Sequence, residues 1–225
     1  MKRVVIKIGS STLVDNGKVD AAFIGSLAAD CAALIKDDEV QPIIVSSGSI
    51  ALGLDILGFG GGERPNDMPT LQAAASVGQV GLIRQYRDTF ALFGVNVGQV
   101  LITRATTGER ESYLHARDTI ERLLELGVVP IINENDTVAV EEIRFGDNDT
   151  LAAMVATSIN ADLVVLLSDI DGLYTADPRR DADAELLETV SKMSAEIEAG
   201  AGGVGSRSGS GGMLTKIAAA RVLMA

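Results

Sequence analysis

The chain has 225 residues, of which 47% are apolar and only 4% aromatic, with no Trp. This length supports one large domain, whose core must be built from aliphatic side chains. The formal net charge of −12 at pH 7 argues against broad binding to nucleic acids or membrane surfaces, because like charges repel.

The cysteine content and the hydropathy indicate the compartment. Cys31 is the single cysteine, so no disulfide can form within the chain, which fits a reducing environment. No uninterrupted apolar stretch is long enough to cross a bilayer. We therefore expect a soluble, cytoplasmic protein.

Predicted strands alternate with predicted helices along the chain. Short apolar runs predict strands at residues 3–8, 42–46, 96–103, 128–133 and 162–168. Helical spacing predicts helices at residues 20–35, within 47–58, at 70–94, 111–127 and 150–160, and from about 214 onward. Asp20 is the expected N-cap of the first of these helices. This alternation predicts an α/β fold, a three-layer αβα sandwich with a mainly parallel open sheet.

The chain shows no linker or internal repeat, so we expect a single domain over residues 1–225. The Gly-rich residues 58–67 are expected to form a mobile surface loop, and residues 137–146 alternate enough to suggest a hairpin. The chain stops within the last predicted helix, so we expect that a final strand or two is missing.

Two kinds of enzyme chemistry are disfavoured by the residue inventory. The single histidine, His115, lies on a predicted helix without a nucleophile pattern nearby, and no G-x-S-x-G string is present, which argues against triad hydrolysis. One His and one Cys also leave no zinc site of the usual type.

The Gly-rich segment before the last helix allows two interpretations. The string "GAGGVG" at 200–205 follows an acidic helical pattern rather than a strand, so it is not a dinucleotide-binding fingerprint. In "GSGGMLTK" the lysine comes four residues after the last glycine, so it is not a P-loop. Taken alone, the segment is either a flexible linker or a nest of backbone amides that binds phosphate at a helix N-terminus.

Three polar strings follow or interrupt buried strands. Lys7 lies inside an apolar strand, where an unpaired lysine is rare, although it could point to solvent from an edge strand. Residues 133–136, "NEND", and residues 147–149, "DND", could be a polar turn and a helix cap, respectively. In open sheets, ligands bind beyond the carboxyl ends of the strands, so their joint occurrence at one edge favours a site.

These strings resemble the amino acid kinase family. The resemblance covers nearly the whole chain and rests on "VVIKIGSS", "VSSGSIALG", "VPIINENDTVA", "GDNDTLAA", "LLSDIDGLYTADPR" and "GSGGMLTKIAAA". Within the family, the chain is most similar to the members that phosphorylate the γ-carboxylate of L-glutamate with ATP, the first step of proline biosynthesis. The resemblance implies the amino acid kinase-like fold, with glutamate bound by the N-terminal part and ATP by the C-terminal part.

The resemblance also implies catalytic roles for three residues. Lys7 would neutralise the transferring phosphoryl group, Lys216 the leaving β–γ side, and Asp149 would orient both ammonium groups. The acceptor carboxylate is already deprotonated at pH 7, so no general base is needed. Catalysis would then come from positioning and from positive charge on the phosphoryl oxygens.

Substrate and nucleotide contacts carry over from the family in the same way. Ser47, Asp136 and Asn148 would bind glutamate, and Gly9 and Gly48 would allow the backbone to approach phosphate and substrate closely. Nucleotide contacts are implied for Lys7, Ser168, Asp169, Ser210, Gly211, Gly212, Met213, Leu214, Thr215 and Lys216. Mg²⁺ would bridge the ATP phosphates without a dedicated protein cage.

Relatives of this type commonly carry a C-terminal PUA domain, which we do not expect within these 225 residues, and the resemblance implies a homo-oligomer (dimer or tetramer) with feedback control by proline. Two alternatives stay open. One is a kinase of the same family with another acceptor, such as acetylglutamate kinase. The other is a non-catalytic sensor of amino acids or nucleotides, because a fold alone does not fix a function.

Overall fold

A parallel sheet forms the centre of the fold in the computed structural model, which describes residues 1–15, 17–37, 39–60, 64–103, 110–139, 148–192, 197 and 212–224. Within these residues the sheet has five strands: β1 (Lys2–Ile8), β4 (Val40–Ser46), β5 (Asn96–Ile102), β6 (Val128–Glu134) and β7 (Leu163–Leu167). Their order is β5-β6-β4-β1-β7, and each neighbouring pair is parallel. All five carboxyl ends therefore lie at the same edge.

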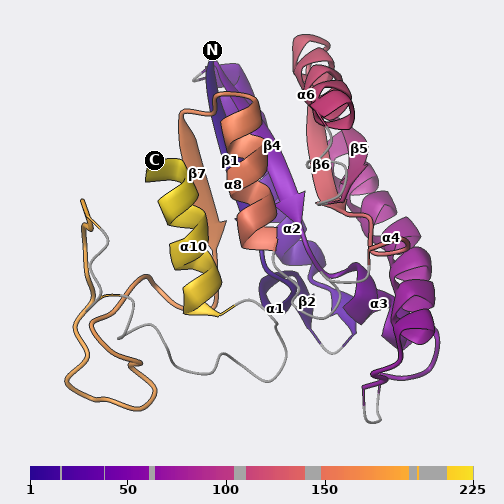
Figure 1. Ribbon diagram of the computed structural model, residues 1–225. Helices are drawn as coiled ribbons and strands as arrows, with labels where there is room; N and C mark the ends of the chain where they lie inside the picture. Colours follow the sequence, from indigo (N-terminus) through magenta and orange to yellow (C-terminus); the bar gives the residue numbers. More distant parts are fainter. Residues whose placement is uncertain are drawn as a thin grey trace.

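Helices cover both faces of this sheet (Figure 1). Helices α2 and α4 pack on one face, and α6 and α8 on the other. Helix α10 packs against α8, and α3 against α4. The bounds are α1 (Ser10–Leu13), α2 (Ala21–Asp37), α3 (Ser49–Ile56), α4 (Met68–Ala91), α6 (Arg110–Glu125), α8 (Asn148–Ser158) and α10 (Met213–Met224). The predicted three-layer αβα sandwich is thus confirmed.

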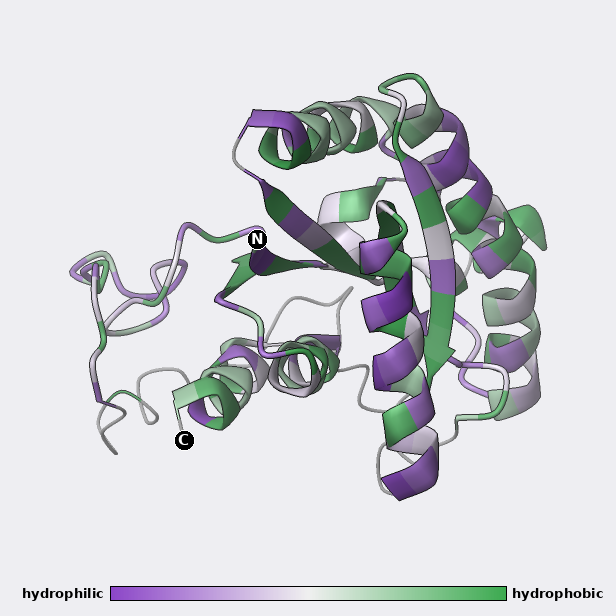
Figure 2. Ribbon diagram, turned by 90° about the horizontal axis from the view of Figure 1, so that it is seen from above, coloured by the Kyte–Doolittle hydropathy of each residue, from purple (hydrophilic) through white to green (hydrophobic). Residues whose placement is uncertain are grey.

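Consecutive strand residues supply the two halves of the core. In β1, Val5 faces α8 and its neighbour Ile6 faces α2 and α4, and Ile43 and Ile44 of β4 divide in the same way. Strands buried on both faces are continuously apolar, which is why they were recognisable in the sequence. Figure 2 shows helices striped with hydrophilic and hydrophobic residues, as expected for helices with one buried face.

The predicted elements agree with the observed ones within a few residues, and the differences have local causes. Asp20 accepts a hydrogen bond from the Phe23 amide at 2.9 Å, as expected of an N-cap. Helix α4 begins before the predicted Thr70, because Asp67 accepts from the Thr70 amide at 3.0 Å and Pro69 follows in the first turn. Sequence reasoning missed the antiparallel strands β2 (Val14–Asp15) and β3 (Lys18–Val19).

Helices α3 and α4 approach each other so closely that glycine is required at the contact. A Cβ atom on Gly78 would lie 1.8 Å from the Ser49 carbonyl oxygen, and one on Gly53 would lie 1.8 Å from the Ala74 carbonyl oxygen. This contact fixes the start of α3 against the middle of α4, where Gln79 lies.

Two predicted loops lie partly outside the described residues. Of the hairpin expected at 137–146, residues 137–139 are described and form part of a turn, and residues 140–146 are not described. Residues 58–60 and 64–67 of the expected surface loop are neither helix nor strand. Residues 169–192 contain a single isolated bridge, between Tyr174 and Leu186.

Candidate active site

Polar residues gather where the strands end. Lys7 is the penultimate residue of β1 and pairs with Val45 of β4 and Leu166 of β7. Beyond β4, the Ser47 amide donates to the Ile8 carbonyl at 3.1 Å, and beyond β6 the Asn135 amide donates to the Ile102 carbonyl at 2.8 Å. These bonds draw the loops after neighbouring strands together at this edge.

Two lysines converge on one buried aspartate at this edge. The Lys7 ammonium lies 2.7 Å from Asp149 Oδ1, and the Lys216 ammonium lies 3.2 Å from Asp149 Oδ2. The Asp149 side chain is 0% exposed, that of Lys7 is 7% exposed and that of Lys216 is 16% exposed. The structure therefore brings together the three predicted catalytic residues, and Lys7 is not a solvent-facing edge residue.

The charge state of Asp149 follows from this arrangement. Burial is the largest single effect and raises the pKa of Asp149, but the Lys7 ammonium, the Lys216 ammonium and a hydrogen bond from Thr215 together outweigh it. The pKa of Asp149 is consequently lowered, and the carboxylate is ionised at neutral pH. The Asp149 carboxylate already forms ion pairs with two lysines, so it is suited to orienting their ammonium groups rather than to accepting a proton.

The start of α10 contributes a second contact to the aspartate. Thr215 Oγ1 lies 2.7 Å from Asp149 Oδ2 and 2.7 Å from the Gly212 carbonyl oxygen, and its single proton serves one acceptor at a time. Met213 begins α10, and Leu214 is exposed. The structure thus places Thr215 and Lys216 in the cluster, whereas Ser210 and Gly211 lie outside the described residues.

Asn148, the first residue of α8, organises the neighbouring loop. Its Nδ2 is within hydrogen-bond distance of Ser47 Oγ at 2.8 Å, Asn133 Oδ1 at 3.0 Å and the Ser46 carbonyl at 3.1 Å. Predicted substrate ligands Asn148 and Ser47 are therefore in direct contact. A hydrogen bond holds Ser46 in place, because its hydroxyl lies 3.0 Å from the fully buried Tyr86 hydroxyl of α4.

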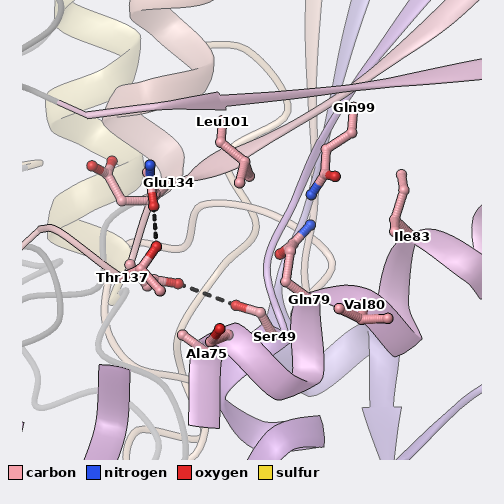
Figure 3. Close-up of a pocket in the computed structure, with 12 residues that line it drawn as sticks. Ser49, Ala75, Gln79, Val80, Ile83, Gln99, Leu101, Glu134 and Thr137 are labelled. Atoms are coloured by element: carbon pink, nitrogen blue, oxygen red, sulfur yellow. Dashed lines mark hydrogen bonds between the residues drawn. The ribbon is translucent and has the colours of Figure 1, made fainter. Parts of the chain in front are cut away.

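Asp136 joins this cluster through Ser49, whose hydroxyl donates to Asp136 Oδ2 at 3.1 Å. Both residues line a pocket of about 280 Å³ between the start of α3, α4, β5 and the end of β6. Figure 3 shows the side chains of Gln79 and Gln99 pointing toward one another in this pocket. The predicted ligand Asp136 therefore faces a cavity that opens beside the Asn148 cluster.

The two predicted glycines differ in what their geometry requires. Gly48 precedes α3 with φ +102°, a left-handed conformation that other residues rarely adopt, and a Cβ there would lie 3.0 Å from Val14. Gly9 has φ −72°, and a Cβ would make only ordinary contacts at 3.8 Å or more. The backbone conformation therefore requires a glycine at position 48, whereas position 9 could accept a residue with a Cβ atom.

Ser168 and Asp169 lie directly after β7, at the same edge of the sheet. Asp169 pairs with Arg179 at 2.9 Å and accepts from the Ser168 hydroxyl at 3.3 Å. Burial raises and the Arg179 hydrogen bond lowers the pKa of Asp169, which is lowered overall. Within the described chain their side-chain hydrogen bonds join them to each other and to Arg179, so both residues lie at the same edge as the lysine cluster but are not part of it.

His115 and Cys31 lie on helices α6 and α2, respectively. The His115 side chain is 76% exposed on α6, with Glu111 one turn away. Cys31 is buried, and burial raises its pKa to about 12. In the part of the chain that is described, no three His, Cys, Asp or Glu side chains are grouped to bind a metal ion, and no helix is long and apolar enough to cross a membrane.

Sequence reasoning left several residues of this site unassigned. Asn133 lies at its centre and was visible within "NEND", and Ser49 follows the predicted Ser47 and Gly48. Tyr86 and Gln79 come from the middle of α4, far along the chain from any recognised string. Their spacing in the sequence gave no signal of this role.

The comparisons with known proteins agree with this geometry. Residues 2–225 match the sequence profile described as "Amino acid kinase family". The chain belongs to the amino acid kinase family. A solved structure of an isopentenyl phosphate kinase, 17% identical, superposes with a TM-score of 0.55 over 84% of this chain and 80% of that chain. That likeness concerns the fold.

Curated members of the amino acid kinase family are more similar in sequence. A protein named glutamate 5-kinase from Rhodopseudomonas palustris (strain BisA53) is 53% identical over 223 residues. Proteins of the same name from Burkholderia thailandensis (strain E264) and Geobacter sp. (strain M21) are 51% and 47% identical. In each case the match covers 98% of this chain but only 58–59% of the relative, so the chain spans less than three fifths of their length.

Proposed function

We propose that this protein catalyses the glutamate 5-kinase reaction, transferring the γ-phosphoryl group of ATP to the γ-carboxylate of L-glutamate to give L-glutamyl 5-phosphate, the first step of proline biosynthesis. The observation that carries the proposal is the convergence of Lys7 and Lys216 on Asp149, at 2.7 and 3.2 Å. The relatives named glutamate 5-kinase, about half identical over 98% of the chain, support the choice of acceptor.

The chemistry needs positive charge more than it needs a base. A carboxylate oxygen of glutamate attacks the γ-phosphorus, the bond from phosphorus to the β–γ bridging oxygen breaks, and ADP leaves with that electron pair. Both reactants are anions, so their approach and the transferring phosphoryl oxygens require cations. Lys7 and Lys216 provide two ammonium groups, and Asp149 fixes where they point.

Glutamate would lie over the loop that follows β4. Asn148 and Ser47, in contact at 2.8 Å, would bind its reacting end beside Lys7. Asp136, at the pocket next to them, would bind the α-ammonium group. Gly48 would bring the backbone close to the substrate at the N-terminus of α3.

ATP would bind where β7 ends and α10 begins. Ser168 and Asp169 would contact the nucleotide, and the segment 210–216 would bring backbone amides and Lys216 to its phosphates. Mg²⁺ would travel with ATP and screen its phosphate charge. This fits the described residues, because both oxygens of Asp149 already face lysines and Asp169 pairs with Arg179.

The reaction is tested by trapping its product. Hydroxylamine converts an acyl phosphate into a hydroxamate, so the purified protein with Mg-ATP should form hydroxamate with L-glutamate. N-acetyl-L-glutamate should give much less. The reverse preference would indicate an acetylglutamate kinase, and binding of glutamate or ATP without hydroxamate would indicate a sensor.

We propose that residues 1–225 act as a single amino acid kinase domain and assemble as a homo-oligomer. Support for assembly comes from apolar side chains exposed on and just after α4 and on the edge strand β5, namely Val80 at 69%, Leu92 at 82% and Leu101 at 40%. Size-exclusion chromatography with light scattering should show a dimer or tetramer, and a monomer at micromolar concentration would refute this part.

A further inference from the structure

Gln79 connects helix α4 to the candidate active site. Its side-chain oxygen Oε1 accepts a hydrogen bond from Asn133 Nδ2 at 2.9 Å, and Asn133 Oδ1 accepts in turn from Asn148 Nδ2 at 3.0 Å. Gln79 is therefore two hydrogen bonds from Asn148, a predicted substrate ligand. It also lines the 280 Å³ pocket that Asp136 faces.

The hydrogen bonds fix which way the Gln79 amide points. The Glu134 backbone amide, at 2.8 Å, and Asn148 Nδ2 are both donors to Asn133 Oδ1, so the other side of the Asn133 amide must be its NH₂ group. That NH₂ donates to Gln79, which must present its oxygen there. The Gln79 NH₂ group is then turned away from Asn133, and in Figure 3 it points toward Gln99 in the pocket. Among the described residues it donates no hydrogen bond.

The donors that the pocket offers to an anion are neutral, among them the amides of Gln79 and Gln99 and the Ser76 hydroxyl. Among the described residues that line it, the ionisable ones are the carboxylic acids Glu134 and Asp136, with no Lys, Arg or His. The Ser49 hydroxyl is already donating to Asp136. The Gln79 NH₂ group is thus a donor available to a carboxylate that enters beside an ammonium group bound at Asp136.

We propose that Gln79 Nε2 binds the α-carboxylate of the amino-acid substrate, which makes Gln79 a specificity-determining residue. The inference rests on the proposed function, because it needs a substrate with a reacting carboxylate at Lys7 and a second carboxylate at its other end. The two carboxyl carbons of an extended glutamate are four carbon–carbon bonds apart, roughly 5 Å. Hydrogen bonds of 3.0 and 2.9 Å, with the Asn133 amide between them, link Asn148 to Gln79. The substrate adds a hydrogen bond of about 3 Å at each end, so its length is compatible with contact to both residues.

The test compares two acceptors in the hydroxamate assay. 4-Aminobutyrate keeps the reacting carboxylate and the amino group of glutamate but lacks the α-carboxylate. Gln79→Met should lower kcat/KM for L-glutamate by about 10- to 100-fold, the typical value of a hydrogen bond to a charged group. The same substitution also removes the acceptor of Asn133 Nδ2, a loss that both substrates share, so kcat/KM for 4-aminobutyrate should fall less than kcat/KM for L-glutamate, by a factor of about 10 or more.

Gln85→Met is the matched control. Gln85 lies on the same helix, and its amide donates only to Thr89 within that helix at 3.3 Å, so this variant should be unchanged with both acceptors. Equal losses with both acceptors in Gln79→Met would mean that Gln79 acts only through Asn133, and no loss would mean that it has no role. Either result would overturn the proposal.

Calorimetric titration of L-glutamate and 4-aminobutyrate into both proteins gives a readout that does not depend on turnover. The inference predicts that Gln79→Met loses more affinity for L-glutamate than for 4-aminobutyrate. If the wild-type protein forms no hydroxamate, the proposed reaction fails, and the titration still decides whether Gln79 distinguishes the two ligands. Unchanged affinity for L-glutamate would refute the inference even in a fully active enzyme.

Discussion

Asp149→Asn is the substitution whose consequences the structure defines best. It removes the negative charge that faces Lys7 at 2.7 Å and Lys216 at 3.2 Å, at a side chain that is 0% exposed, while keeping its size. Removing one partner of a buried ion pair typically costs about 3–5 kcal/mol of unfolding free energy. Lys216 can reach water, so we expect the lower end, about 3 kcal/mol, or a Tm lower by about 6–12 °C in a domain of this size.

The pH dependence gives this prediction a second readout. The folded-state pKa of Asp149 lies below its ordinary value of 3.8, so its stabilising contribution is complete above that value and is lost as the pH falls through the folded pKa. The difference in Tm between wild type and Asp149→Asn should therefore be constant from pH 8 to about pH 5. It should shrink below pH 3.8.

Asp88→Asn is the matched control, because Asp88 also faces two cations, Arg84 at 3.4 Å and Arg87 at 2.6 Å, but is half exposed on α4. Its Tm should not change measurably, since exposed ion pairs are screened by water. Asp149→Asn should also lower hydroxamate formation by about 100-fold, because both ammonium groups lose their alignment. Equal Tm values for the two variants, or a difference that grows at acidic pH, would refute the reasoning.

Three further predictions concern the surroundings of the site. Gly78→Ala should lower both stability, by about 1–3 kcal/mol, and turnover, because its Cβ would lie 1.8 Å from the Ser49 carbonyl oxygen; an unchanged melting curve would contradict that packing. Tyr86→Phe should cost about 0.5–1.5 kcal/mol in denaturant titrations, because the Ser46–Tyr86 hydrogen bond is lost while Ser46 keeps its bond to the Ser47 carbonyl; wild-type stability would show that the bond is unimportant. Cys31 is buried with its pKa raised to about 12, so thiol reagents at pH 8 should label it only on unfolding; rapid labelling of the native protein would contradict its burial.

The sheet could be predicted because its strands are buried on both faces and therefore apolar throughout. The segment from Val128 to Ile132, for example, is apolar throughout, and Pro130 is its single residue of a type common in turns. The β2–β3 hairpin was missed although Asn16-Gly17 lies between its strands, because each strand has only two residues. Helix α4 begins before the predicted Thr70 because Asp67, the last residue of the expected surface loop, caps it and Pro69 lies in its first turn.

The site could be predicted only where its residues follow strands or open helices. Lys7 stood out because a lysine inside an apolar strand needs a partner, and the structure supplies Asp149 as that partner. Gln79 and Tyr86 could not be found in this way, because a polar residue on a long amphipathic helix is ordinary in sequence. Their roles depend on how closely α3 packs on α4, which is a tertiary contact between glycines and carbonyls.

The central claim is that the two lysines act on one transferring phosphoryl group, and hydroxamate formation by Lys7→Met and Lys216→Met tests it most directly. Each variant should form L-glutamyl hydroxamate about 100- to 1,000-fold more slowly than wild type at saturating L-glutamate and ATP. The control Lys36→Met, at an exposed lysine in the last turn of α2, should be unaffected. Wild-type-like turnover by a folded Lys7→Met or Lys216→Met protein would contradict the account.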